Sequence, residues 1–416
     1  MILIAIALLA LFVAWNLGAN DVANSMGTSV GSKALSLRQA LGVAGILEFL
    51  GAVLFGQAVA ATLATEITNP ELFIDRPQTL LLGMVSVLLA AGIWLQIATR
   101  FGLPVASSHA VVGAIAGFSG VAAGVDAIAW GKIGQIAIAW ILTPLISGIV
   151  AAVFYGVVQR WILQQSQPLV QLREWIPWMS VLLLTVFGAI VLPELVTQLP
   201  NLTLPPHTFS LALGSGGAVG LTLLSWQRLQ QVQQPESNSP GEKKHFSVLE
   251  GQLARFQVLS ACFVAFAHGS NDVGNAIAPL AAVVYILSTN QVPLHPFDIP
   301  LWIMIVGGVG IVLGLAIQGK NVITTIGEDI IPLQPSSGFC AELATAATIL
   351  IASRLGFPVS TSHALVGAVV GIGLLQNREN VRFSTLRSVI LAWAVTLPIA
   401  AGISAIAFGI LQQFLV

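Results

Sequence analysis

The chain has 416 residues, of which 56% are hydrophobic and only 8% are charged, and its formal net charge is −1. Soluble domains carry about 25% charged residues, so this chain cannot cover a globule with polar surface and must face lipid over most of its area. The near-zero net charge also excludes a nucleic-acid-binding surface and a basic patch for a membrane surface. We therefore expect an all-α integral membrane protein.

Apolar stretches of about 20 residues, the length that crosses a bilayer, recur along the chain. Seven precede a polar segment, near 1–23, 39–64, 79–99, 104–124, 133–158, 175–193 and 208–227. Five follow it, near 256–287, 299–318, 336–354, 358–376 and 388–414. The polar segment, Gln227 to Arg255, is rich in Gln, Pro and Ser and is expected to be a linker. We expect about twelve transmembrane helices.

The first stretch has no Lys or Arg before it, which favours a retained helix over a cleaved signal peptide. It ends in the motif "GANDVANS", which places Asn20, Asp21 and Asn24 beside an apolar run. Carboxylate and amide oxygens are hard ligands of the kind that Na⁺ prefers. An intramembrane carboxylate could equally carry a proton, and the alternative to both is a polar contact between helices.

The same motif returns as "GSNDVGNA", with Asn271, Asp272 and Asn275. On an intact helix the Asp lies about 100° from the two Asn residues. We expect the preceding glycine of each motif, Gly18 and Gly269, to allow a local unwinding that brings the three side chains together. Na⁺ is then expected at Asp21 and Asp272.

A second repeated motif follows in each half of the chain. "GLPVASSHA" carries Ser107 and Ser108, and "GFPVSTSHA" carries Ser360, Thr361 and Ser362. The proline of each motif suits the first turn of a helix, where N–H groups lack acceptors and the helix dipole is positive. Two such helix starts with hydroxyl donors predict a site for a compact oxyanion. The alternative is that the hydroxyls only cap their own helices.

Two further acids lie in apolar stretches, Glu48 in "GILEFLGA" and Glu342 in "GFCAELATA". Intramembrane acids are functional by default, so we expect both to serve ion coupling or gating. The histidines of the hydroxyl motifs, His109 and His363, are expected to be hydrogen-bonded structural residues.

The two halves are copies of one another. "FVAWNLGANDVANSMG" (Phe12–Gly27) and "FVAFAHGSNDVGNAIA" (Phe263–Ala278) share eight of sixteen positions at an offset of 251. "ATRFGLPVASSHAVVGAIAG" (Ala98–Gly117) and "ASRLGFPVSTSHALVGAVVG" (Ala352–Gly371) share twelve of twenty at an offset of 254. We expect a first repeat over 1–160, two linking spans over 161–228, a short cytoplasmic linker over 229–251 and a second repeat over 252–416.

An odd number of stretches precedes the second copy, so it starts on the opposite side of the membrane from the first. The Lys and Arg residues favour the same count, because loops around 160–173, 228–255 and 378–387 carry them and loops 194–206 and 288–298 carry none. Inverted repeats are typical of secondary transporters, whose site lies at mid-membrane where broken or re-entrant helices of both copies meet. Both termini are expected on the extracytoplasmic side.

With these motifs in hand, the sequence resembles the inorganic phosphate transporter (PiT) family. The matching segments are "GANDVANSMGTSVGSKALSLRQA", "HGSNDVGNAIAPL", "PSSGFCAELATA" and "GFPVSTSHALVGAVVG". The resemblance implies import of inorganic phosphate with Na⁺ or H⁺, or of sulfate in a minority of members. It also implies that Asp21, Asp272, Glu48 and Glu342 stand at transport-critical acids, and that Ser107, Ser108, Thr361 and Ser362 stand at substrate-binding hydroxyls.

We therefore expect a Na⁺-coupled phosphate symporter in a bacterial inner membrane, with H⁺-coupled transport of phosphate, metal–phosphate or sulfate as the alternative. Its expected partners are inorganic phosphate, Na⁺ and the lipid bilayer; a homodimer is allowed for, and nucleic acid is not. A hydrolase is disfavoured, because Ser108 adjoins His109 in poor triad geometry. No cofactor is expected, and no disulfide between Cys262 and Cys340, which lie in separate apolar stretches.

Overall fold

The computed structural model of the chain describes residues 1–413 except for Gly102, Pro104, 198–205, 233–240, 327–332, Arg378 and Asn380. Its α-helices are α1 (Ile2–Gly31), α2 (Leu37–Phe55), α3 (Gln57–Thr65), α4 (Pro77–Arg100), α5 (Ser107–Ala123), α6 (Trp130–Val158), α7 (Pro168–Thr197), α8 (Pro206–Val232), α9 (Gly241–Thr289), α10 (Leu301–Ile326), α11 (Pro335–Arg354), α12 (Thr361–Gln376) and α13 (Phe383–Gln412). Two 3₁₀ turns, η1 (Pro70–Phe73) and η2 (Val125–Ala127), and a π-helical turn, η3 (Gln159–Leu163), lie in the connections. Within the described residues the fold is otherwise loops and one isolated bridge, Thr68–Ile128.

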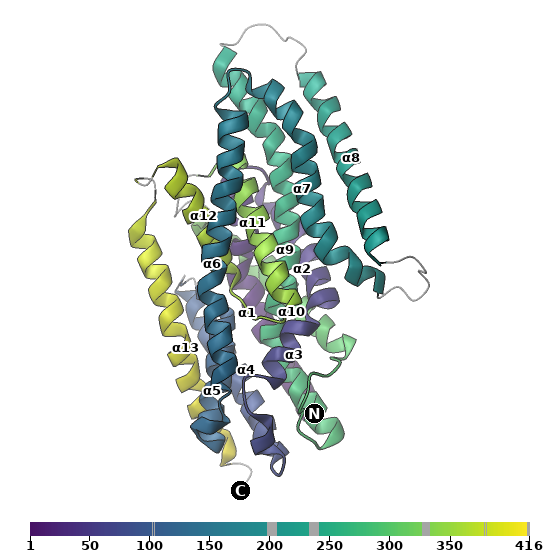
Figure 1. Cartoon of the computed structure of the whole chain (residues 1–416). Coiled ribbons are helices and arrows are strands. Elements are labelled where there is room, and N and C mark those ends of the chain that lie inside the picture. Colours follow the sequence, from purple (N-terminus) through teal and green to yellow (C-terminus); the bar gives the residue numbers. More distant parts are fainter. Residues whose placement is uncertain are drawn as a thin grey trace.

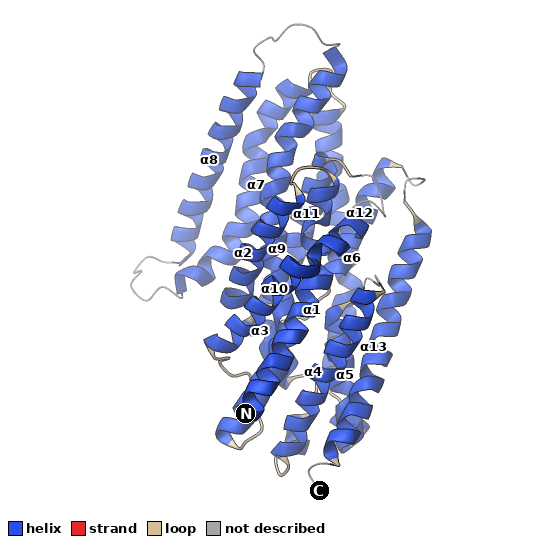
Figure 2. Cartoon of the chain, turned by 180° about the vertical axis from the view of Figure 1, so that it is seen from behind, coloured by secondary structure: helices blue, strands red, loops and turns tan. Residues whose placement is uncertain are grey.

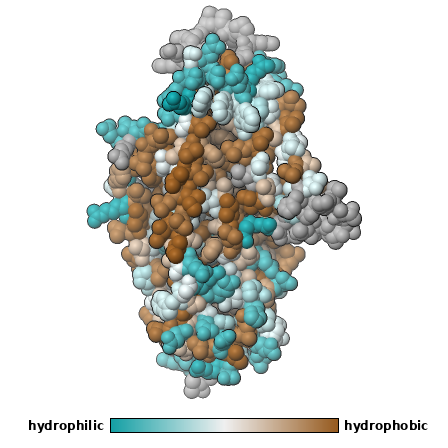
Figure 3. Space-filling model, viewed as in Figure 1, coloured by the Kyte–Doolittle hydropathy of each residue, from teal (hydrophilic) through white to brown (hydrophobic). Residues whose placement is uncertain are grey.

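The described residues include ten helical segments long and apolar enough to cross a bilayer: α1, α2, α4, α6 with η3, α7, α8, α9, α10, α11 and α13. The middle of the molecule carries a broad hydrophobic belt between hydrophilic ends (Figure 3). Large apolar side chains such as Ile141, Ile149 and Ile406 are about two-thirds exposed there. Such a surface is stable in lipid and not in water, so the chain is an integral membrane protein.

Two of the predicted spans are helices too short to cross the bilayer. α5 has 17 residues and α12 has 16, so each is about 25 Å long, short of a hydrocarbon core of about 30 Å. Each follows a longer helix and returns toward the side from which that helix came, α4–α5 in the lower half of Figure 1 and α11–α12 in the upper half. The predicted count of twelve spans is therefore not confirmed, whereas the expected re-entrant helices are found.

The loops around the first hairpin place both of its ends on one side. The Asn69 amide donates to the Ala127 carbonyl at 2.7 Å, and Thr68 pairs with Ile128. The segment before α4 and the segment after α5 are therefore neighbours. The Pro104 ring that was expected to start this helix lies outside the described residues.

Two other predicted boundaries differ from the structure. The predicted span 39–64 is divided into α2 and α3 at Gly56, where an added Cβ would lie 2.3 Å from a methyl of Val273. The predicted linker 229–251 is shorter, because α8 continues to Val232 and α9 already starts at Gly241. Residues 233–240 between them are outside the described part of the chain.

The two copies of the acidic motif lie on antiparallel helices. α1 starts at the end of the molecule that holds both termini, and α9 starts at the opposite end (Figure 1); Figure 2 shows the same from behind. The inverted orientation expected from the sequence is therefore seen in the arrangement of these helices. The hairpin of α4 and α5 returns the chain to the side from which it entered. The second copy therefore still starts on the opposite side from the first, as the count of apolar stretches predicts.

Both motif helices are continuous, so the predicted unwinding at Gly18 and Gly269 is wrong. An added Cβ on Gly18 would lie 1.9 Å from the carbonyl oxygen of Ile311, and one on Gly269 would lie 2.0 Å from that of Glu48. Small residues allow helix backbones to approach this closely in membranes. The two glycines are needed for helix packing and not for a break.

These contacts interleave the two repeats. α1 packs on α10 and α9 on α2, while α5 packs on α13 and α12 on α6. The hairpin contacts again need glycine, because an added Cβ would lie 2.4 Å from the Leu397 carbonyl at Gly113 and 2.2 Å from the Pro144 carbonyl at Gly367. Every motif helix is therefore held by a helix of the other copy, which places all four motifs at the centre of the molecule.

Labelling of single cysteines tests the inverted arrangement. In a variant with Cys262 and Cys340 replaced by Ala, we introduce Ser166→Cys before α7 or Ser288→Cys at the end of α9. Both positions are exposed, and they lie at opposite ends of the bundle. An impermeant thiol reagent applied to intact cells is expected to label position 288 and to reach position 166 only after permeabilisation.

Labelling of both positions from the same side would contradict the inverted arrangement. Labelling at 166 and protection at 288 would keep the inversion but reverse its direction in the membrane.

Candidate functional site

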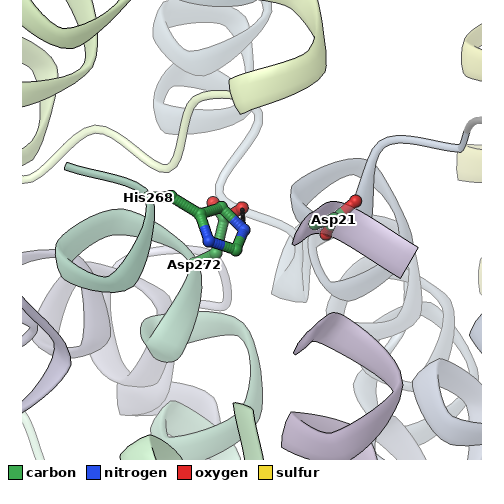
Figure 4. A group of neighbouring side chains, drawn as sticks. All are labelled: Asp21, His268 and Asp272. Carbon is green, nitrogen blue, oxygen red and sulfur yellow. Dashed lines mark ion pairs between the residues drawn. The ribbon is translucent and has the colours of Figure 1, made fainter. Parts of the chain in front are cut away.

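The centre of the molecule holds a cluster of three titratable side chains, Asp21 on α1 and His268 with Asp272 on α9 (Figure 4). One ligand atom from each residue lies within 4.8 Å of the others, and all three side chains are buried. His268 and Asp272 are one helical turn apart, which brings the imidazole Nε2 within 2.9 Å of Asp272 Oδ2. The antiparallel contact of α1 with α9 supplies Asp21.

The amides of the first motif converge on its carboxylate without any unwinding. Asn20 Nδ2 and Asn24 Nδ2 donate to Asp21 Oδ1 at 3.1 and 3.2 Å. All three side chains are at least 95% buried. The second carboxylate oxygen, Asp21 Oδ2, has no hydrogen-bond partner among the described residues.

The amides of the second motif reach outward to the hairpins. Asn271 Nδ2 donates to Ser353 Oγ at 2.9 Å and to the Phe357 carbonyl at 3.1 Å, both at the α11–α12 tip. Asn275 Nδ2 donates to Ser107 Oγ at 3.3 Å, at the start of α5. The second acidic motif therefore touches the tips of both hairpins.

The hydroxyl motifs meet the acidic motifs at the same place. Thr361 Oγ1 donates to Asp272 Oδ2 at 3.0 Å, and Ser107 lies beside both Asn275 and Asp21. Ser108 Oγ is fully buried and has no partner among the described residues. The two hairpins thus bring hydroxyls from opposite sides of the molecule to one central position.

Only one of the five hydroxyls acts as a helix cap. Ser360 is the N-cap of α12 and accepts from the His363 amide at 3.4 Å. Its hydroxyl also lies 2.8 Å from Ser362 Oγ. The N-cap of α5 is Ala106, which has no side chain that could cap, so capping alone does not account for Ser107 and Ser108.

Glu48 belongs to the same centre. The Ser25 hydroxyl donates to Glu48 Oε1 at 2.8 Å, and His268 Nδ1 lies 3.1 Å from the same oxygen. His268 therefore bridges Glu48 on α2 and Asp272 on α9, and all of these side chains are buried. The sequence placed Glu48 in the membrane but not beside the second motif.

Glu342 forms a separate cluster on the linker side of the centre. Its carboxylate accepts from Thr28 and Ser29 of α1 at 2.5 and 2.6 Å, and from Gln257 and Ser260 of α9 at 3.2 and 2.8 Å. No cation lies among these four partners, so the carboxylate is held by neutral donors. It connects α11 to both motif helices.

The histidines of the hydroxyl motifs, which the sequence predicts to be structural, make hydrogen bonds and ring contacts with other helices. His109 Nδ1 lies 3.2 Å from the Trp393 carbonyl, and His363 Nδ1 lies 3.2 Å from the Trp140 carbonyl. Each ring also packs at a tilt on a tryptophan of its own copy, with His109 3.8 Å from Trp140 and His363 3.7 Å from Trp393 between centroids. These contacts join α5 and α12 to α6 and α13 behind the tips.

The buried carboxylate and amide oxygens at the centre suit a hard cation. Asp21 Oδ2, Asp272 Oδ1, Asn271 Oδ1 and Asn275 Oδ1 are buried and make no hydrogen bond within the described residues. Buried carboxylate oxygens are costly unless a cation or donor satisfies them. Carboxylate and amide oxygens are ligands that Na⁺ accepts, whereas the single imidazole in the cluster already contacts two carboxylates.

Sequence reasoning missed several residues of the centre. The most important is His268, which stands at the start of the quoted motif "HGSNDVGNA" and four residues before Asp272, so its spacing was a usable signal. The hydroxyl and amide partners of the two glutamates had no such signal, because they come from distant helices. They are Ser25, Thr28, Ser29, Gln257 and Ser260.

Comparison with known proteins gives concordant matches. A model of the "Phosphate transporter family" matches residues 17–404. A putative phosphate permease of Thermococcus kodakarensis is 39% identical over 400 residues, covering 96% of this chain and 95% of the relative. A putative phosphate permease of Haemophilus influenzae is 36% identical and covers 98% and 96%.

A plant protein and a solved structure extend these matches. The chloroplastic inorganic phosphate transporter 2-1 of Arabidopsis thaliana is 36% identical over 434 residues, covering 99% of this chain and 72% of that protein. A structure described as the sodium-dependent phosphate transporter has a TM-score of 0.89 and 33% identity, covering 99% of this chain and 100% of that chain.

Proposed function

The chain belongs to the phosphate transporter family, and on that premise we propose that it imports inorganic phosphate by symport with Na⁺. It is a membrane transporter and not an enzyme, as its family and relatives are. The structural neighbour is described as a sodium-dependent phosphate transporter, which supports the choice of Na⁺ as the coupling ion. We assign the central cluster to the binding of the transported phosphate and Na⁺.

The observation that carries the proposal is the convergence of both hairpin tips on α9. Thr361 donates to Asp272, and Ser107 accepts from Asn275, so hydroxyl-bearing helix starts from opposite sides lie against one acidic motif. Helix N-termini with hydroxyl donors bind compact oxyanions. We infer that phosphate binds between the tips, on Ser107, Ser108, Thr361 and Ser362, with Ser360 supporting the start of α12.

Charge balance supports simultaneous binding of Na⁺. A phosphate group carries roughly one to two negative charges near neutral pH, and Asp21 and Asp272 add further negative charge to a buried site. No Lys or Arg lies in either hydroxyl motif to offset it. Bringing phosphate to this position therefore costs little only when cations bind with it, and the oxygens of Asn20, Asp21, Asn24, Asn271, Asp272 and Asn275 are placed to hold them.

The two hairpins provide a simple route to alternating access. Each enters from one side and ends at the central site. Each also packs on a long helix of the other repeat, α5 on α13 and α12 on α6. Movement of one hairpin would open the site to one face while the other keeps it closed. Glu342, which ties α11 to α1 and α9, is placed to report on the position of the second hairpin.

A second candidate is H⁺-coupled transport of phosphate, and one observation favours it. His268 bridges Glu48 and Asp272, a chain of titratable groups that could pass a proton to the central site. Transport of sulfate or of a metal–phosphate complex has no such specific support in the structure. Na⁺ coupling remains the first candidate, because the unpartnered oxygens outnumber what one proton would satisfy.

Uptake of labelled phosphate into proteoliposomes tests the proposal. We expect accumulation with an inward Na⁺ gradient, none with choline in place of Na⁺, and no loss on addition of a protonophore. Accumulation in choline driven by an inward pH gradient would instead favour H⁺ coupling. Equilibration without accumulation under any gradient would point to a channel, and competition by excess sulfate would show a broader oxyanion site.

We further propose that the protein lies in a bacterial plasma membrane with both termini outside. The Lys and Arg residues at the linker side support this orientation, since positive loops stay in the cytoplasm. The repeat boundaries near 160 and 252 and the homodimer allowed for by the sequence remain predictions.

A further inference from the structure

The tip of the second hairpin, between α11 and α12, is in contact with α3. The tip lies against the second acidic motif, because the Phe357 carbonyl accepts a hydrogen bond from Asn271 Nδ2 at 3.1 Å. Gly356 has a φ of 70°, a left-handed conformation that favours glycine. A Cβ added to Gly356 would lie 2.9 Å from Thr62 Oγ1 of α3. The backbone of the tip therefore packs directly on α3.

A cation lies over the same tip. Lys132, near the start of α6, has its Nζ 2.5 Å from Glu66 Oε2 and 5.4 Å from the centre of the Phe357 ring. Glu66 is the C-cap residue of α3. The Lys132 and Glu66 side chains are 21% and 36% exposed, so water reaches the pair. Lys132 thus connects α3 and α6 to the tip, at the boundary between water and the buried centre.

These contacts lie on the side of the central site that holds both chain termini. α3 lies below the tip in Figure 1, in the half of the molecule where N and C are marked. Backbone hydrogen bonds join the loop after α3 to the loop before α6. The Ala129 amide donates to the Ile67 carbonyl at 3.0 Å, and the Asn69 amide donates to the Ala127 carbonyl at 2.7 Å. The end of α3 and the start of α6 therefore form one framework beside the tip.

The sequence of the first hairpin does not repeat the residues of this contact. Its "GLP" segment carries Leu103 where the "GFP" segment of the second hairpin carries Phe357, and Leu103 is exposed. When the "AW" pairs within α6 and α13 are aligned, Thr385 stands at the position of Lys132. Neither the aromatic ring nor the cation has a counterpart in the other copy. The contact therefore belongs to one side of the molecule, as a gate for that side requires.

We propose that Glu66, Lys132 and Phe357 form a latch that holds the tip of the second hairpin closed over the central site on the side of the termini. The inference rests on the proposed transport, in which the site opens to each face in turn. Opening toward the termini moves the tip away from α3, so the Phe357 ring must leave Lys132. A partly exposed ion pair and a cation–π contact are each weak, so the latch favours the closed tip and still opens in every transport cycle.

Two other roles are open to Lys132. Its pair with Glu66 could be an ordinary surface contact, which contributes little to any equilibrium. Its ammonium could instead attract phosphate toward the site. The first role predicts that neither Lys132 nor Phe357 affects access to the surface beneath the tip. The second predicts that loss of Lys132 raises KM for phosphate.

The first test measures access to the surface beneath the tip and does not depend on transport. Thr62 is 5% exposed, so Thr62→Cys is expected to react slowly with an impermeant thiol reagent in a variant with Cys262 and Cys340 replaced by Ala. Lys132→Gln is expected to raise this rate roughly twofold to tenfold, because the closed tip loses the ion pair and the cation–π contact. Phe357→Leu, which copies the residue of the first hairpin, is expected to raise it in the same direction.

Three further variants separate the latch from a general loosening of the tip. Lys132→Arg keeps the charge over the ring and should react like the Thr62→Cys parent. Glu71→Gln removes an exposed acid of η1 and should also react like the parent. Lys132→Gln combined with Phe357→Leu should react no faster than Lys132→Gln alone, because the two residues act through one contact. Equal rates in all variants would overturn the latch.

The second test measures Na⁺-driven uptake of inorganic phosphate. In Lys132→Gln we expect kcat to fall roughly twofold to tenfold, because fewer loaded molecules close on the side of the termini, whereas KM for phosphate should not rise. A rise in KM with unchanged kcat would assign Lys132 to attraction of the anion and would overturn the latch. Absence of uptake by the wild type under Na⁺ or pH gradients would overturn the proposed function instead. Because the thiol test still reports on the latch in that case, the two failures are distinguishable.

Discussion

Replacing Asp272 with Asn is expected to abolish the accumulation of phosphate by proteoliposomes under an inward Na⁺ gradient, and replacing Asp21 with Asn is expected to do the same. These are the largest effects that the proposed symport predicts. The amide keeps the size of the side chain and removes its charge at a buried position. Loss of one partner of a buried charge pair costs about 3–5 kcal/mol, which corresponds to roughly a hundredfold or larger loss of affinity for the cation.

The reason is sharpest for Asp272, which receives the Thr361 hydroxyl and contacts His268 through the same oxygen. Its other oxygen has no partner within the described residues and is the one that a cation would use. Asn in its place presents either a single carbonyl oxygen or an N–H donor that repels the cation. Concentrative uptake then fails even where phosphate still reaches the site.

A matched control separates this effect from the loss of any acid. Asp126→Asn makes the same chemical change at an exposed position of η2, away from the cluster, and is expected to transport like the wild type. All three variants are compared at equal amounts of reconstituted protein with the same elution profile. Wild-type uptake with unchanged Na⁺ dependence in either Asp21→Asn or Asp272→Asn would show that the assignment is wrong.

The position of the central site could be predicted from the sequence because the motifs come in pairs. Two copies of each motif at nearly equal offsets, with an odd number of stretches before the second copy, predict antiparallel motif helices. Asp21 and Asp272 then meet only if these helices cross at the motifs. The glycines at 18 and 269 lie against α10 and α2, where they allow helix backbones of the two repeats to approach closely.

The unwinding of the motif helices could not be judged from the geometry of one helix alone. On α1 alone, Asn20 and Asn24 flank Asp21 around the helix, and unwinding looks necessary for convergence. In the structure the amide side chains are long enough to reach Asp21 Oδ1 from neighbouring turns. The remaining partners come from α9 and the hairpins and not from the freed backbone of α1.

The lengths of α5 and α12 could not be predicted from hydropathy. The segments before them, around Val105 and Val359, are apolar and buried but extended, so they lengthen the apolar stretch without adding helix. The true helices start only at Ser107 and Thr361. The hydroxyls that begin each helix therefore lie at the bottom of a hairpin, in the middle of the protein, and not at a membrane surface.

The partners of Glu48 and Glu342 depend on contacts between distant segments. His268 reaches Glu48 because α2 packs on α9 at Gly269, one residue further along the helix. The Gln257 side chain lies directly across α11 at Gly338, where an added Cβ would lie 2.0 Å from its amide nitrogen. It can therefore donate to Glu342. A sequence identifies such acids as buried but does not say which donors satisfy them.

Loss of the hydroxyls at the hairpin tips is expected to weaken phosphate binding by about tenfold or more. Thr361→Val with Ser362→Ala removes two donors while largely keeping shape, and each hydrogen bond to a charged group contributes about 1.5–3 kcal/mol. Ser107→Ala with Ser108→Ala is expected to act similarly from the other hairpin. The measurement is the phosphate dependence of Na⁺-driven uptake, in which we expect KM for phosphate to rise.

Hydroxyls that bond only their own helix provide the control. Thr348→Val with Ser388→Ala makes the same pair of chemical changes at positions whose hydroxyls donate to the carbonyls of Ala344 and Ser384. This variant is expected to keep the wild-type KM. A rise in KM here equal to that in the tip variants would mean that the loss reflects helix stability in general.

The pattern across the two tip variants decides how the anion is held. α5 and α12 come from opposite sides and from opposite repeats, and their first hydroxyls meet the second acidic motif at Asp272 and Asn275. If one phosphate bridges both tips, each double variant raises KM, and each also weakens the dependence on Na⁺, because the anion and the cations share that motif. If neither double variant changes KM, the hydroxyls serve only the local structure of their helices, and phosphate must bind elsewhere in the molecule.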